Sequence, residues 1–124
     1  MSVSVASHAS RARAWIVAEL AAAGIEATGD AGAFYPQPVG VLVGLPTLTG
    51  RLLDGARFTV PVSIVSGDPL NSEETVDRIY ALADDVAAVL STPAYRPASY
   101  RSTANAEPLP AIELAVIVTT EEVS

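Results

Sequence analysis

The chain has 124 residues, of which 50% are hydrophobic and 17% charged, so it can bury the core of one domain and is too apolar to be disordered. It contains no cysteine, which excludes a disulfide scaffold, a thiolate zinc site and a cysteine nucleophile. Its net charge of −7 excludes the basic surface that a general nucleic-acid binder needs.

The first predicted element is a helix over residues 7–23, which a serine can cap at its start and Gly24 can end. Trp15 flanks the apolar stripe of this helix, and we expect it to pack on the sheet. No window reaches the roughly 18 uncharged apolar residues of a membrane span, so none is expected. The stripe follows 3-4 spacing and comprises Ala9, Ala12, Ile16, Leu20 and Ala23.

Residues 25–28 form a short strand candidate, and the next strand is predicted at Val39 to Leu45. In this second stretch bulky residues alternate with Gly40 and Gly44, which predicts a buried strand with one nearly bare face. A bare face indicates the close approach of another backbone or a helix. Residues 47–56 are predicted to be a hairpin-like connection that ends in the turn pair Asp54-Gly55, and the loop 46–56 is expected to project from the sheet.

The clearest strand is RFTVPVSIVSG, residues 57–67, in which Phe58 and the alternate residues after it share one face. Pro61 removes one backbone donor, which predicts an edge strand or a bulge. Asn71 and Glu74 then predict the capped start of a second helix that runs to Leu90. The remaining residues predict two strands, most simply a hairpin.

This order of elements predicts an α+β fold, with a mostly antiparallel sheet packed against two helices in the order α-β-β-β-α-β-β. Neither an internal repeat nor a linker divides the chain. Residues 1–124 are therefore predicted to form a single domain.

Groups that could carry catalysis are scarce in this sequence. The one histidine, His8, is better explained as a solvent-exposed or helix-start residue than as a catalytic one. The pair Glu73-Glu74 fits the charge cluster of a helix start, and no metal-ligand spacing or phosphate-binding loop occurs. We expect no catalytic residue, no metal, no cofactor and no enzymatic activity.

The layout resembles that of the small tail terminator (tail completion) proteins of long-tailed, siphovirus-type bacteriophages, and of related head–tail joining proteins. The likeness covers an N-terminal amphipathic helix, the aromatic-proline turn FYPQP, and the strand VPVSIVSG followed by the helix NSEETVDRIYALADDVAAVL. It is strongest in the strand–turn–helix block from Val60 to Leu90, and a final hairpin completes it.

This resemblance implies a structural protein of the virion, assembled in the cytoplasm of a bacterial host. It implies a ring, usually of six subunits, on the head-proximal end of the tail tube. The ring stops tube polymerisation and offers a surface to the head–tail connector protein. The implied partners are further copies of the chain, the tail tube protein and the connector, while DNA passes through without specific binding.

Two groups of residues are candidates for these contacts. The acidic residues are expected to face the ring lumen, where carboxylates repel DNA phosphates, although ordinary surface charge explains each of them singly. Phe34 and Tyr35 lie either on a subunit contact or on the rim of the core. The subunit or tube contact candidates are Phe34, Tyr35, Arg51, Arg96 and Arg101, and the lumen candidates are Asp84, Asp85, Glu113, Glu121 and Glu122.

A small dimeric α+β ligand-binding or regulatory module is the alternative function. Such a module would pair through a sheet edge and enclose an apolar pocket, whereas the ring protein would form closed cyclic assemblies.

Replacing both Phe34 and Tyr35 with alanine tests the contact hypothesis. We expect the double variant to stay folded by circular dichroism and to assemble less well by light scattering. An unfolded double variant would instead assign both side chains to the rim of the core.

Overall fold

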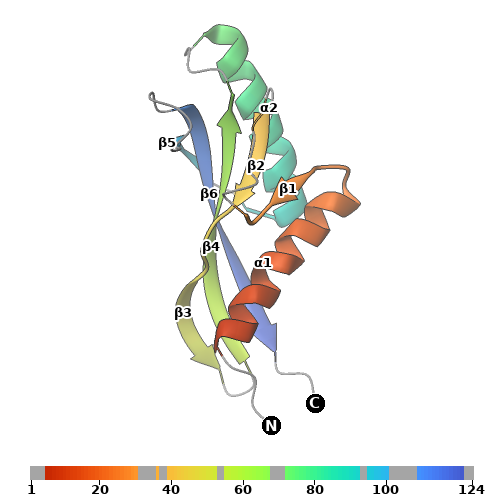
Figure 1. Ribbon diagram of the computed structural model, residues 1–124, viewed down its shortest axis with the longest axis vertical. Coiled ribbons are helices and arrows are strands. Elements are labelled where there is room, and N and C mark those ends of the chain that lie inside the picture. The colour runs from red at the N-terminus through yellow and green to blue at the C-terminus, as the bar shows by residue number, and fades with distance from the viewer. Residues whose placement is uncertain are drawn as a thin grey trace.

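The architecture is a sheet with helices on one face (Figure 1). The computed structural model describes residues 5–30, 36, 39–52, 55–67, 72–92, 95–100 and 109–121. Within these residues, helices α1 (Val5–Ala22) and α2 (Glu73–Leu90) pack on a six-stranded sheet, which confirms the predicted α+β class. The strands are β1 (Ala27–Thr28), β2 (Val39–Val43), β3 (Thr47–Leu52), β4 (Gly55–Ser66), β5 (Tyr95–Tyr100) and β6 (Leu109–Glu121).

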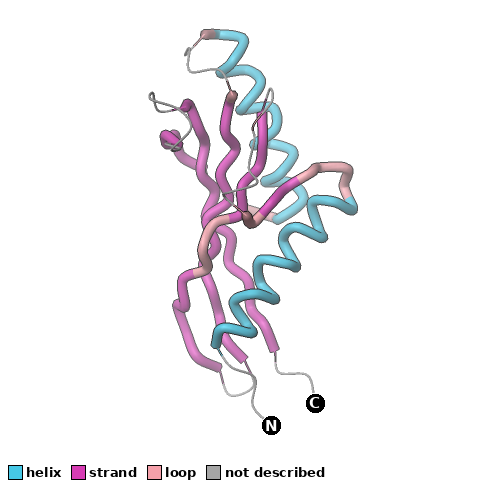
Figure 2. The backbone as a smooth tube through the Cα atoms, viewed as in Figure 1, coloured by secondary structure: helices cyan, strands magenta, loops and turns pink. Residues whose placement is uncertain are grey.

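Strand β4 is the centre of the sheet. The strand order is β1-β2-β4-β6-β5, and β3 continues beyond β2 along the same edge of β4 (Figure 2). The β4–β6 pairing is antiparallel and runs from Gly55↔Glu121 to Val65↔Ala111. Because β4 has neighbours on both sides, the prediction that Pro61 marks an edge strand is wrong.

The pairing around Pro61 shows why proline is tolerated in this central strand. Its carbonyl oxygen accepts a hydrogen bond from the Gly44 amide at 2.7 Å, on the β2–β3 side. The N–H and C=O of one strand residue point to the same side, so the missing donor also faces that side. There β2 has ended at Val43 and β3 begins only at Thr47, whereas the β4–β6 pairing continues through Pro61↔Ala115.

The presence of β3 corrects the predicted element order. Residues 46–56 were expected to project as a connection, but β3 pairs with β4 at Leu48↔Phe58 and Arg51↔Ala56, with a register shift before Gly50. The order is therefore α-β-β-β-β-α-β-β. Gly50 interrupts the short Thr/Leu alternation of β3, so the sequence alone does not identify this strand. The edge of β4 supplies its hydrogen-bonding partner.

The stretch from Val39 to Leu45 is buried only in part. Val41 and Val43 lie in the core, as predicted, but Leu45 follows the end of β2 and is 78% exposed. The expected close approach to the bare face occurs at Gly44. A Cβ there would lie 2.8 Å from Cγ and 3.1 Å from the carbonyl oxygen of Pro61.

The middle of the predicted stripe of the first helix is confirmed, because Ala12, Ile16 and Leu20 are fully buried, whereas Ala9 is only partly buried and Ala23 is exposed beyond the end of the helix. Trp15 does not pack on the sheet as expected. It is 46% exposed, because it lies about 100° around the helix from Ile16. No helix in the described residues is long and apolar enough to cross a bilayer.

The N-cap of the second helix lies one residue after its predicted position. Ser72 is the N-cap in place of Asn71, and its hydroxyl oxygen accepts from the Thr75 amide at 3.2 Å. The helix ends at Leu90, as predicted, where Ser91 adopts a left-handed conformation with φ of 54°. Together both helices bury Phe58 and the alternate residues of β4 and β6 in one core.

Two glycines of the β2–β3 edge make a matched test of this packing. Gly44→Ala should lower the free energy of unfolding by roughly 1–3 kcal/mol, because its Cβ collides with Pro61. Gly50→Ala should have little effect, because its Cβ would meet the Cβ of Arg57 at 3.8 Å. Urea unfolding of both variants checks this, and equal destabilisation would contradict the close approach.

Candidate functional site

The predicted contact residues lie at opposite edges of the sheet. Arg96 is exposed on β5, where its Nη2 donates to Glu113 Oε1 of β6 at 2.8 Å. Arg51 belongs to β3 at the other edge, so the structure does not bring these two arginines together. Phe34, Tyr35 and Arg101 lie outside the described residues.

The predicted lumen residues divide between two faces of the molecule. Asp84 and Asp85 are exposed on α2, within the helix layer. Glu113 lies on the other face of the sheet, where Arg96 balances its charge. Glu121 ends β6, and Glu122 is outside the described residues. A ring axis can face only one of these surfaces, so the acidic candidates do not form one site.

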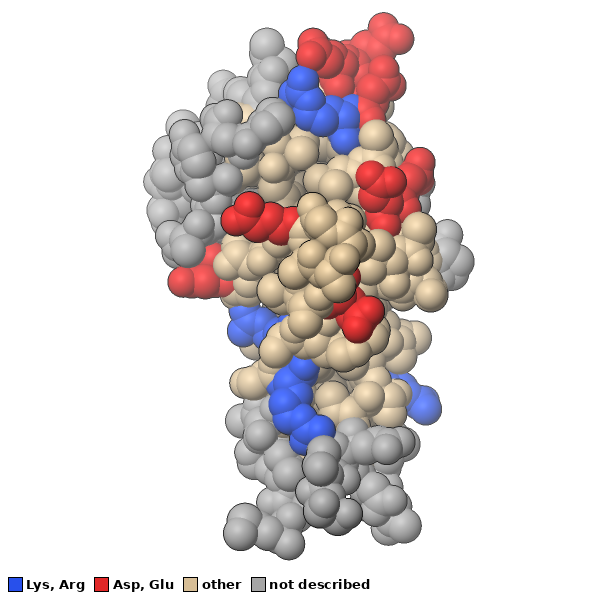
Figure 3. All heavy atoms as spheres, turned by 90° about the vertical axis from the view of Figure 1, so that its right-hand side faces the viewer, with Lys and Arg blue, Asp and Glu red and all other residues tan. Residues whose placement is uncertain are grey.

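The helix layer has an uneven charge. Helix α2 carries five acidic residues and one basic residue, Arg78, which forms an ion pair with Glu74 at 2.8 Å. Helix α1 carries Arg11 and Arg13 with one acidic residue. Figure 3 shows acidic side chains over the upper and middle parts of this side, with one basic group among the uppermost of them and further basic side chains below.

The face of the sheet opposite the helices is open in the described part of the chain. On β4 and β6 the residues that alternate with the core face are small, polar or exposed, among them Thr59, Ala115 and Thr119. Ile117 interrupts this polar surface, since it is 68% exposed in the middle of β6. At the upper end Val65, Leu109 and Ala111 form a small second cluster on this face.

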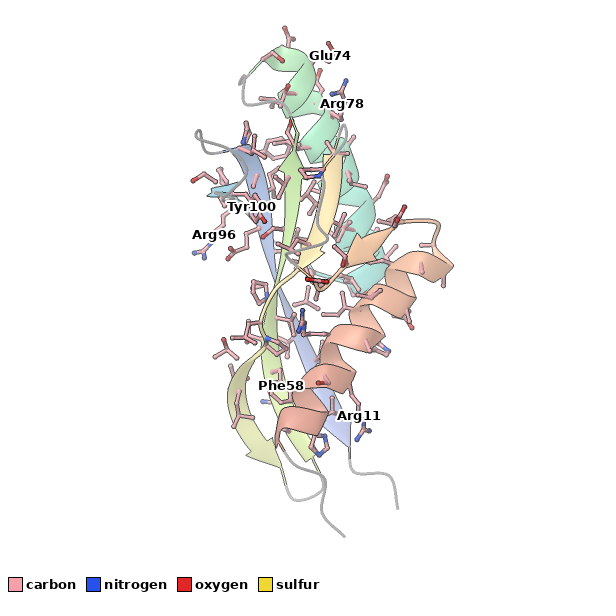
Figure 4. All side chains as sticks on the ribbon, viewed as in Figure 1. Arg11, Phe58, Glu74, Arg78, Arg96 and Tyr100 are labelled. Atoms are coloured by element: carbon pink, nitrogen blue, oxygen red, sulfur yellow. The ribbon has the colours of Figure 1, made fainter. Side chains whose placement is uncertain are left out.

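Strand β6 also has a free edge. Strand β5 pairs only with residues 109–114 of β6, and no described strand pairs with the outer edge of residues 115–121. A groove follows this edge beside α1 and is lined by Arg11, Trp15 and residues 117–120. Figure 4 places Arg11 on α1 close to this end of β6.

Exposed large hydrophobic side chains concentrate in the half of the molecule that contains α1, β3 and residues 115–121 of β6, which we call the α1 half. Trp15 and Ile117 flank the free edge of β6, while Leu45 and Leu48 lie along the edge that β2 and β3 form on the other side of β4. The fifth such residue in the described chain, Tyr80, lines a separate groove between α2, β5 and β6. Single exposed hydrophobics are common, but two groups at opposite strand edges indicate contact surfaces.

His8 fixes α1 against the end of β6. The side chain is buried, so the solvent-exposed alternative is wrong, and the helix-start alternative agrees with its place in the first turn of α1. Its Nδ1 lies 2.7 Å from Thr120 Oγ1, whose hydroxyl donates to the Ala56 carbonyl oxygen at 3.4 Å. Both hydrogen bonds form together when His8 Nδ1 carries the proton, because the Thr120 hydroxyl then accepts from His8 and donates to Ala56.

The groups needed for metal binding do not converge in the described part of the chain. No three of its His, Cys, Asp and Glu side chains could hold one ion together. Arg13 is committed to the fold instead, because its Nη2 donates to the Gly29 carbonyl oxygen and joins α1 to the segment after β1.

Sequence reasoning missed the apolar strand edges. The signal for Ile117 was present, because it stands on the face of β6 that otherwise carries Glu113, Ala115 and Thr119. Nothing local identified Trp15, whose exposure depends on how α1 docks. Comparison with known proteins gives no guide here, since no family model matches the chain and the search of curated proteins finds no match.

The Thr120 contact can be tested with its neighbour as a control. Thr120→Val keeps the shape but leaves buried His8 without a partner, which should lower the free energy of unfolding by roughly 1–3 kcal/mol. Thr119→Val, at the adjacent exposed position, should change it by less than about 0.5 kcal/mol. Thermal unfolding that ranks the two variants the other way would refute the contact.

Proposed function

We propose that this chain is a structural assembly protein, a tail terminator of a long-tailed phage, which forms a ring of about six subunits on the head-proximal end of the tail tube. The proposal takes the ring and the tube from the likeness in the order of elements. The surface of the molecule supports it independently through the two apolar edges described above.

The observation that carries the proposal is the pair of exposed apolar groups at opposite edges of the α1 half. Trp15 and Ile117 lie on one edge, and Leu45 and Leu48 on the other. Different surfaces on the two sides of one subunit are what a head-to-tail contact requires, and such contacts close into a ring when the rotation is suitable. A two-fold dimer would need only one of them.

The mechanism is steric and requires no covalent step. One face of the ring matches the last ring of tube subunits, so it binds there with the favourable free energy of apolar burial. The opposite face does not match a tube subunit, which ends polymerisation, and serves as the contact for the head–tail connector. The negative net charge reduces the attraction between the ring and the DNA that passes through it.

The alternative, a dimeric ligand-binding or regulatory module, is favoured by one feature. The groove between α2 and the β5–β6 pair is lined by Ile79, Tyr80, Pro97 and neighbouring residues, and it could hold a small apolar ligand. A saturable ligand seated there, together with a stable dimer, would replace the proposed function.

Tube assembly in vitro tests the proposed function. Tail tube subunits that polymerise with increasing amounts of the chain should give progressively shorter tubes in electron micrographs, with extra density at one end. Ile117→Asp places a charge on the apolar edge and should raise the amount needed roughly tenfold.

Ala81→Asp, which adds the same charge at an exposed position on α2, is the matched control and should act like the unmodified chain. Tubes whose length does not respond to the unmodified chain, and whose ends stay bare, would refute the function.

A further inference from the structure

The free edge of β6 lacks the protection that strand edges usually carry. Residues 115–121 read AVIVTTE, a run of high strand propensity without proline or lysine and with its single charge at the end. The edge of β5, by contrast, carries Arg96 and Pro97. Monomeric proteins normally protect such a strand edge with proline, charged side chains or a β-bulge, so an unprotected edge indicates a partner strand.

The same chain supplies a strand of matching length at the same level of the sheet. Rows of paired residues cross the α1 half from one edge to the other, for example Thr47–Thr59–Ile117 and Leu48–Phe58–Val118. Strand β3 therefore lies directly across β4 from residues 117–121 of β6. Its outer edge is also without a partner among the described residues.

We propose that a second copy of this chain docks on the free edge of β6 through its β3, so that the sheet continues head to tail from one subunit to the next. This inference rests on the proposed ring and identifies the contact that closes it. Strands β3 and β6 are both antiparallel to β4, so β3 of the next copy runs parallel to β6.

Apolar side chains on the two edges complement each other in this arrangement. Leu48 pairs with Phe58, whose side chain faces the helices, so Leu48 lies on the helix side of the sheet. Leu48 of the docking copy then meets the groove beside β6 of the neighbouring copy, which Trp15 of that neighbouring copy lines. Both side chains are partly exposed in the single subunit, and their contact removes that apolar surface from water.

The size of the closed sheet determines which face lines the channel. At the level of β3, three strands from each of six subunits (β3, β4 and β6), spaced about 4.8 Å apart, give a circumference of roughly 86 Å and a radius of about 14 Å. A helix layer about 10 Å thick would fill that space, so the helices lie outside and the open face lines the channel. Asp84 and Asp85 then face outward, while Glu113 lies on the face of the sheet that lines the channel.

Engineered disulfides test the contact cleanly because the chain has no cysteine. The variant Thr47→Cys/Ile117→Cys places thiols on both edges in one row. Within one subunit these positions are two strand spacings apart, about 10 Å, which is too far for a disulfide. Oxidation should therefore join subunits only, and a non-reducing gel should show a ladder that ends at the subunit number of the ring.

Three controls make the result specific. Neither single variant should cross-link alone, whereas a mixture of the two should give dimers and nothing larger. Glu74→Cys/Ile117→Cys, with one thiol at the exposed far end of α2, should give no ladder. Dimers from Ile117→Cys alone would show a β6–β6 contact and overturn the proposal.

Cross-linking in the presence and absence of tube subunits separates this inference from the proposed function. A ladder from a chain that leaves tube length unchanged supports the contact and refutes the terminator. Shortened tubes without a ladder in either condition support the terminator and refute the contact.

Discussion

The antiparallel pairing of β4 with β6 is the interaction on which the rest of the structure depends. It extends from Gly55↔Glu121 to Val65↔Ala111, and its two-residue alternation separates a core face from an open face. Both helices bury their stripes against the core face. Because β6 continues well past the end of β5, the same pairing that builds the core also leaves an unpaired edge beside α1. The β4–β6 pairing therefore organises the core and also creates the candidate contact surface.

The periodic parts of the sequence were sufficient to predict the elements that this ladder organises. The alternation from Phe58 onward, the stripe through Ile16 and the helix that ends at Leu90 depend on local spacing, and the fold class followed from them. Strand β3 pairs with the adjacent β4, and it was missed because Gly50 interrupts its alternation, whereas the place of Pro61 depends on partners distant in the sequence. Proline is tolerated in the central strand because the break between β2 and β3 lies opposite it, and the residues around Pro61 do not encode that break.

The candidate site shows the same division between local and long-range information. Sequence reasoning chose charged and aromatic residues near turns, and the structure places Arg96 in a cross-strand ion pair and separates Asp84 from Glu113 by the thickness of the sheet. Ile117 carried a local signal on the otherwise polar face of β6, but that it lies at an unpaired strand edge emerges only from the register. Ile117 has no strand on its outer side because β5 is short, and Trp15 is exposed because Ile16 takes the buried position. Such edges promote uncontrolled aggregation unless a defined partner covers them, which is why they point to assembly.

Residue-resolved amide hydrogen exchange in β6, followed as a function of protein concentration, tests the central claim most directly. Alternate amides among residues 115–121 point away from β4. They should exchange quickly in dilute protein and become protected as subunits associate, together with the outward amides of β3. The amides directed toward β4 serve as the internal reference, because they are protected at every concentration. Outward β6 amides that exchange freely in an assembled particle would contradict the account.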